Sequence, residues 1–171
     1  MKHLPVCQTD LVSGFLCNIC QKKLDVGEIT EFEIDLARDL IELEENSNEI
    51  FGFLEDISFY KAIDYEDVVI IVVGKKDKLR ITQKLIDWIK EKYEIDEIIL
   101  IERTNKIRPV VESLIAPAKI LSINEIFLAT GDVEFKAVIR GSDMKNVLFT
   151  KDELEDLVKE LTGNISRIEV Q

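Results

Sequence analysis

The sequence is poor in the residues that mark several large classes of protein. Its 171 residues include one histidine, three cysteines, three prolines and seven glycines, and no low-complexity tract. This composition excludes collagen-like and disordered chains. His3, the only histidine, lies near the chain end, where it is not expected to be held as a base, so no Ser/His/Asp set is expected; the sequence holds no P-loop or dinucleotide fingerprint. We therefore expect a protein that is not an enzyme.

Long hydrophobic runs are also missing. The longest apolar stretch, Val68 to Val73, is far shorter than the roughly 20 residues that span a bilayer. The amino end lacks the apolar run of a signal peptide. We therefore expect a cytoplasmic protein with no membrane partner, and the 46% of hydrophobic residues suffices for a packed core.

Charge is distributed unevenly along the chain. The 34 acidic and 22 basic residues give a net charge of −12, which argues against a general nucleic-acid coat. Residues 24–68 hold 15 acidic and only two basic residues, so the rest of the chain is slightly basic. Any phosphate binding is expected at the basic cluster that follows the apolar strand: Lys75, Lys76, Lys78, Arg80 and Lys84.

All three cysteines lie near the amino end, as Cys7-x9-Cys17-x2-Cys20 with His3 ahead of them. A Cys-x-x-Cys turn brings two thiolates to one tetrahedral ion, and an odd cysteine count disfavours a disulfide framework. The pattern predicts a structural Zn²⁺ site in a zinc knuckle over residues 1–27, with His3 as the fourth ligand. Incidental cysteines beside a frayed His3 are the alternative, and a catalytic thiol is the least favoured.

Periodicity and capping signals predict a repeated order of elements. The capping boxes Thr30-x-x-Glu33 and Thr150-x-x-Glu153 predict helices over 31–45 and 151–161. Further helices are expected over 78–93 and 108–115, and strands over 50–62, 67–73, 97–102, 119–128, 134–140 and 165–170.

Two halves of the chain therefore share the order helix, strand, strand, glycine loop, helix, strand. Gly74 and Gly141 are expected at the same place in each half, after the second strand. This pattern predicts an α/β (α+β) fold made by duplication of a small module. The expected domains are residues 1–27, 28–105 and 106–171.

This order of elements resembles the prokaryotic-type KH module, an RNA-binding α/β unit. The segment Val-Val-Glu-Ser-Leu-Ile-Ala-Pro-Ala-Lys-Ile-Leu-Ser at residues 110–122 is similar to the one that joins the two KH modules of transcription factor NusA. The apolar strand at residues 98–102 resembles the strand that closes the first NusA module. With the leading cysteines, the chain resembles an archaeal NusA-like KH protein over residues 28–170.

The resemblance implies two tandem KH-like modules and a non-catalytic factor that binds single-stranded RNA in transcription elongation, termination or a related process. KH modules clamp about four nucleotides with a Gly-x-x-Gly loop at a helix start. The matching residues are 74–77 and 141–144, and neither loop keeps its second glycine. Asp77 would also set a negative charge against a phosphate. The first loop is favoured, with Gly74, Lys75, Lys76, Lys78, Arg80 and Lys84 as the RNA-binding residues.

An alternative function is a protein adaptor that keeps the KH scaffold without binding RNA. The missing second glycines and the net charge of −12 favour this alternative. Its contacts would be the zinc knuckle and the acidic helix over 31–45. A basic partner such as RNA polymerase or a ribosomal protein would fit that helix.

Overall fold

The computed structural model describes residues 1–171, with the side chain of Asn48 excepted. The chain forms two compact units, Met1–Arg103 and Thr104–Gln171. Each unit is a mixed α+β structure with its own three-stranded sheet. Among the described residues, no helix has the length and apolar character needed to cross a membrane.

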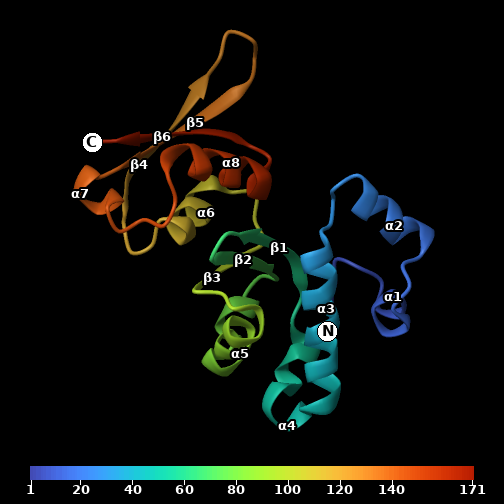
Figure 1. The fold of residues 1–171 in the computed structure, drawn as a ribbon. Helices are drawn as coiled ribbons and strands as arrows, with labels where there is room; N and C mark the ends of the chain where they lie inside the picture. The colour runs from blue at the N-terminus through green and yellow to red at the C-terminus, as the bar shows by residue number, and fades with distance from the viewer. The chain divides into compact units, whose positions relative to one another are not determined.

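The first unit packs helices on one face of the sheet β1-β2-β3 (Figure 1). β1 and β2 are antiparallel, whereas β2 and β3 are parallel. The core is formed by the strand face that carries Val69, Ile71 and Val73, together with apolar residues of α3 and α5. The elements in chain order are α1 Gln8–Ser13, α2 Asn18–Asp25, α3 Glu31–Asn46, α4 Asn48–Phe51, η1 Gly52–Asp56, β1 Phe59–Tyr65, β2 Val68–Val73, η2 Asp77–Leu79, α5 Gln83–Tyr93 and β3 Glu97–Glu102.

The second unit has the sheet β4-β5-β6 with the same pattern of pairing, antiparallel and then parallel. The β4–β5 hairpin extends beyond the helices of this unit (Figure 1). Gly163, which has a φ of 75°, ends α8 in the left-handed conformation that glycine adopts without strain. The elements are α6 Ile107–Leu114, β4 Ile120–Phe127, β5 Val133–Ile139, α7 Gly141–Met144, α8 Lys151–Thr162 and β6 Ile165–Val170.

Both sheets contain the same register irregularity. The shift falls between Phe59 and Lys61 in the first sheet and between Ile120 and Ser122 in the second. An extra residue in the same place of two sheets with the same strand order supports duplication of one module. In this register Gly74 corresponds to Arg140, so the expectation that Gly74 and Gly141 are equivalent is wrong by one residue.

Several elements differ from the sequence expectations. The predicted strand over 50–62 is helical in its first half, because Phe51, Leu54 and Ile57 are buried at a spacing of three residues. The short helices α1 and α2 were not predicted. Residues from Gly141 form the short helix α7 rather than a loop. The helix expected over 78–93 begins at Gln83, after the single 3₁₀ turn η2.

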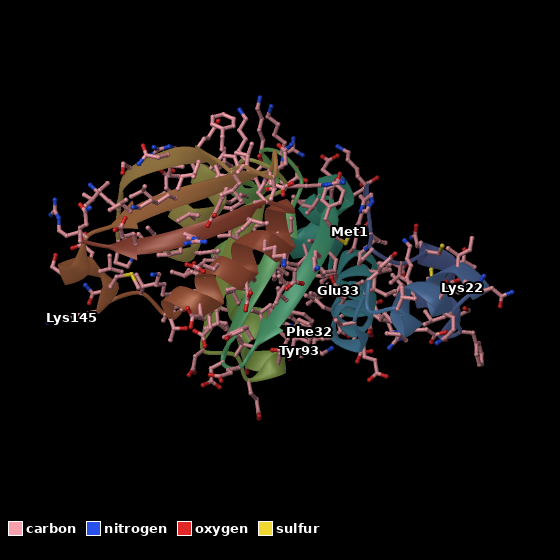
Figure 2. All side chains as sticks on the ribbon, turned by 90° about the horizontal axis from the view of Figure 1, so that it is seen from above. Met1, Lys22, Phe32, Glu33, Tyr93 and Lys145 are labelled. Atoms are coloured by element: carbon pink, nitrogen blue, oxygen red, sulfur yellow. The ribbon has the colours of Figure 1, made fainter. Side chains whose placement is uncertain are left out.

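A buried carboxylate links the start of α3 to the first sheet. The predicted capping box at Thr30 is confirmed, and Glu33 is only 1% exposed. The Glu33 side chain is labelled in Figure 2. One of its carboxylate oxygens accepts the Thr30 N–H at 2.8 Å, and the other accepts the Ala62 N–H of β1 at 2.9 Å. Burial raises the pKa of Glu33, and these two N–H groups oppose the rise. Glu33 thus acts both as a helix cap and as a cover for the edge strand β1.

Replacing Glu33→Gln is expected to lower the free energy of unfolding by about 1–3 kcal/mol. A glutamine side chain offers one acceptor oxygen, so one of the two N–H groups loses its partner. Urea unfolding measures the difference. The control is Glu42→Gln on the exposed face of the same helix, which should change stability by less than about 0.5 kcal/mol. Equal stability of Glu33→Gln and the native chain would contradict this role.

Candidate functional site

Four side chains near the amino end form a cluster that can hold a metal ion: Cys7, Asp10, Cys17 and Cys20, whose ligand atoms all lie within 4.8 Å of one another. Cys7 is the N-cap of α1, and Asp10 is in the first turn of that helix. Cys17 is the N-cap of α2, and Cys20 is in its first turn. Each helix therefore supplies one ligand at its N-cap and a second three residues later.

The spacing of the ligand atoms suits a tetrahedral ion. The sulfur atoms of Cys7 and Cys20 are 3.6 Å apart. Two thiolates bound at about 2.3 Å to a tetrahedral zinc ion lie about 3.8 Å from each other. Asp10 is held in place because its Oδ2 accepts the N–H of Cys17 at 3.0 Å. The cluster therefore has the dimensions of a four-ligand site.

The electrostatics of the cluster also favour a cation. Burial raises the pKa of the Cys20 thiol to about 12, because the thiolate would lose its hydration. In contrast, the N–H of Cys17 and the thiols of Cys20 and Cys17 lower the pKa of Asp10. Asp10 thus supplies a negative charge, whereas Cys20 becomes a thiolate readily only when a positive ion lies beside it.

His3, the fourth ligand expected from the sequence, lies elsewhere. Its Nδ1 is 3.1 Å from the carbonyl oxygen of Phe59, and its ring stacks against Tyr60 with centroids 4.2 Å apart. Among the described residues, the metal-ligating group contains Asp10 and not His3. The sequence did carry the signal, because Cys7-x-x-Asp10 has the same spacing as Cys17-x-x-Cys20.

The predicted RNA-binding residues lie between the end of β2 and the first turn of α5. Five basic side chains of this segment are exposed: Lys75, Lys76, Lys78, Arg80 and Lys84. Arg80 pairs with Asp56 at 3.4 Å, and both side chains are more than half exposed, so the pair is weak. We call residues 74–84 the basic segment.

Gly74 and Asp77 have a structural role within the basic segment. Asp77 is 9% exposed, and its Oδ2 accepts the N–H of Ser58 at 2.9 Å. A Cβ atom at Gly74 would lie 2.3 Å from that same oxygen, so only glycine leaves room for the Asp77 carboxylate. The Asp77 carboxylate, which the sequence suggests would oppose a phosphate, is therefore hydrogen-bonded within the fold.

The start of α5, at the end of the basic segment, can accept an anion. Thr82 is the N-cap of α5 without a side-chain capping bond, and the first turn of this helix contains no acidic residue. The unpaired N–H groups of that turn carry the positive end of the helix dipole. They lie next to Arg80 and Lys84 in the sequence, at the carboxyl-terminal end of the segment that the sequence predicts to bind RNA.

Comparison with solved structures shows a likeness in fold. No family model matches the chain. No curated protein matches it. The structure is similar to the crystal structure of the archaeal protein APE1850, with a TM-score of 0.50 and 18% sequence identity. The match covers 72% of this chain and 94% of that protein, and at this identity it shows a shared fold alone.

Replacing Asp77→Ala is expected to destabilise the first unit by about 1–3 kcal/mol, because the Ser58 N–H loses its acceptor. Thermal and urea unfolding measure the loss. The matched control is Asp96→Ala at an exposed position, for which we expect a change below about 0.5 kcal/mol. If Asp77→Ala is as stable as its control, Asp77 is free to face a ligand and its assignment as a structural residue is wrong.

Proposed function

We propose that the chain is a NusA-like factor with two KH-like modules that binds single-stranded RNA during transcription. Three features support this proposal. The two units repeat the same strand order and the same register irregularity. The segment over residues 110–122 resembles the junction between the NusA modules. The basic segment provides the RNA-binding residues Gly74, Lys75, Lys76, Lys78, Arg80 and Lys84.

The observation that carries the proposal is the arrangement of charge around the start of α5. Five exposed cations lie within ten residues of one another, beside a helix start that has no acidic residue in its first turn. Lysine and arginine side chains bind the phosphate backbone by displacing counterions, and a helix start adds N–H donors. Asp77 is 9% exposed and bonded to Ser58, so its carboxylate does not project to the surface, and the five exposed cations outnumber its single charge.

Replacing Lys75, Lys76 and Lys78 together with glutamate should weaken the binding of short labelled RNA and flatten its salt dependence. Three lost phosphate contacts reduce the log–log salt slope by about 2, at about 0.7 per contact. Fluorescence anisotropy at several salt concentrations measures both effects. The control replaces the exposed Lys119, Lys151 and Lys159 with glutamate, which changes the net charge equally. An unchanged titration, or equal weakening by both triple variants, would refute binding at the basic segment.

We also propose that Cys7, Asp10, Cys17 and Cys20 hold a structural Zn²⁺ ion. Three thiolates and one carboxylate are a donor set that zinc accepts in tetrahedral geometry. The helices α1 and α2 bury only Asp10, Leu11 and Cys20, so they contribute little to a core of their own. A bound ion would link α1 to α2 and stabilise their packing, which few buried residues support.

The purified protein is expected to contain one zinc ion per chain, and chelation should lower the midpoint of thermal unfolding. Cys20→Ser should abolish zinc retention, because it removes a buried ligand. Asp10→Asn should weaken retention, whereas the exposed Asp25→Asn should leave it unchanged. A colorimetric zinc-release assay measures the stoichiometry. Full retention in Asp10→Asn would show that Asp10 is not a ligand, and absence of zinc from the native protein would refute the site.

A further inference from the structure

A hollow lies between the loop that joins α1 to α2 and the first turns of α3. Its volume is about 300 Å³, and it is separate from both the metal cluster and the basic segment. The residues that line it are Gly14, Leu16, Glu31, Ile34, Asp35 and Arg38. All of them belong to the first unit.

The lining of this hollow combines apolar and acidic groups. Leu16 is half-buried and presents apolar surface to the hollow, whereas Ile34, at 6% exposed, adds only a small apolar area to its lining. Glu31 and Asp35 are exposed one helical turn apart on α3. Arg38 also lines the hollow and donates to Asp35 at 2.9 Å, so the lining holds two carboxylates and one cation.

An exposed aromatic residue belongs to the loop that lines the hollow. Phe15 is 82% exposed and lies in sequence between Gly14 and Leu16, which both line the hollow. Val12 of α1 and Ile19 of α2, within four residues of Phe15 in the sequence, are also exposed, at 70% and 69%. Exposed large apolar side chains are frequent at protein-binding surfaces. An exposed phenylalanine beside an acidic hollow fits a partner that is both cationic and partly apolar.

We propose that this hollow binds a lysine or arginine side chain from a basic segment of a partner protein. The long apolar stem of such a side chain would pack on Leu16 and Ile34 while its cation reaches Glu31 and Asp35. The ring of Phe15 would cover the stem or stack on a guanidinium group. RNA does not fit this surface, because its phosphates would be repelled by the two carboxylates.

This proposal locates the basic partner expected for the acidic helix, and it stands independently of RNA binding at residues 74–84. Charge reinforces it, because α3 and the segment that precedes it carry further exposed acids that attract a basic partner at a distance: Glu28, Glu42 and Glu45. Attraction of that diffuse kind would not depend on Phe15 or on the hollow. The two sources of binding can therefore be separated by variants.

The test uses the full zinc-loaded chain and a labelled peptide of alternating arginine and alanine, with a glutamate–alanine peptide as the negative probe. Fluorescence anisotropy gives the affinity, and thermal unfolding confirms that each variant is folded. Glu31→Gln with Asp35→Asn should weaken binding about tenfold, and Phe15→Ala should weaken it severalfold. The matched control, Glu42→Gln with Glu45→Gln, removes the same charge elsewhere on α3 and should have a much smaller effect.

Three results would overturn the proposal. Equal weakening by the two double variants would show diffuse attraction to an acidic helix rather than a site. Unchanged affinity in Phe15→Ala would show that Phe15 does not contact the bound side chain. Absence of arginine-peptide binding at low salt would refute the hollow as a docking site. None of these results bears on the RNA titration, because that experiment reports on the basic segment.

Discussion

The outer edge of β1 is the constraint on which the first unit depends. An edge strand presents N–H and C=O groups that must be covered. Here the N–H of Lys2 donates to the Ile57 carbonyl at 2.9 Å, the N–H of Phe59 donates to the His3 carbonyl at 2.9 Å, and Glu33 accepts the Ala62 N–H. These bonds fix the amino end and α3 against one strand. The chain that leads to Cys7 therefore starts from a fixed position beside α3.

The sequence predicted those elements whose signals are local. Both capping boxes are confirmed, and the strands predicted over 97–102 and 165–170 have those bounds in the structure. Residues 50–56 form helical turns although the sequence predicts a strand there, because their apolar residues are close together and only the burial of Phe51 and Leu54 shows the helical spacing. Short helices such as α1 have little propensity signal and form through packing, which sequence periodicity does not show.

The candidate sites were predicted only in part, because the sequence shows local spacings but not tertiary contacts. A short spacing such as Cys-x-x-Cys specifies which ligands meet, so the three cysteines could be grouped from sequence. The fourth position depends on tertiary structure: β1 holds His3 by its ring and main chain, and the start of α1 brings Asp10 to the cysteines. Asp77 illustrates the same limit, because its bond to Ser58 joins residues 19 positions apart.

We propose RNA binding at the basic segment in spite of a net charge of −12. The most direct test is an anisotropy titration of the zinc-loaded native chain with short single-stranded RNA at two salt concentrations. We predict micromolar or tighter binding at low salt. The slope of log affinity against log salt concentration should be about −2 to −3, as three or four phosphate contacts would give. No binding at low salt would contradict it and would leave the chain as a protein-binding scaffold.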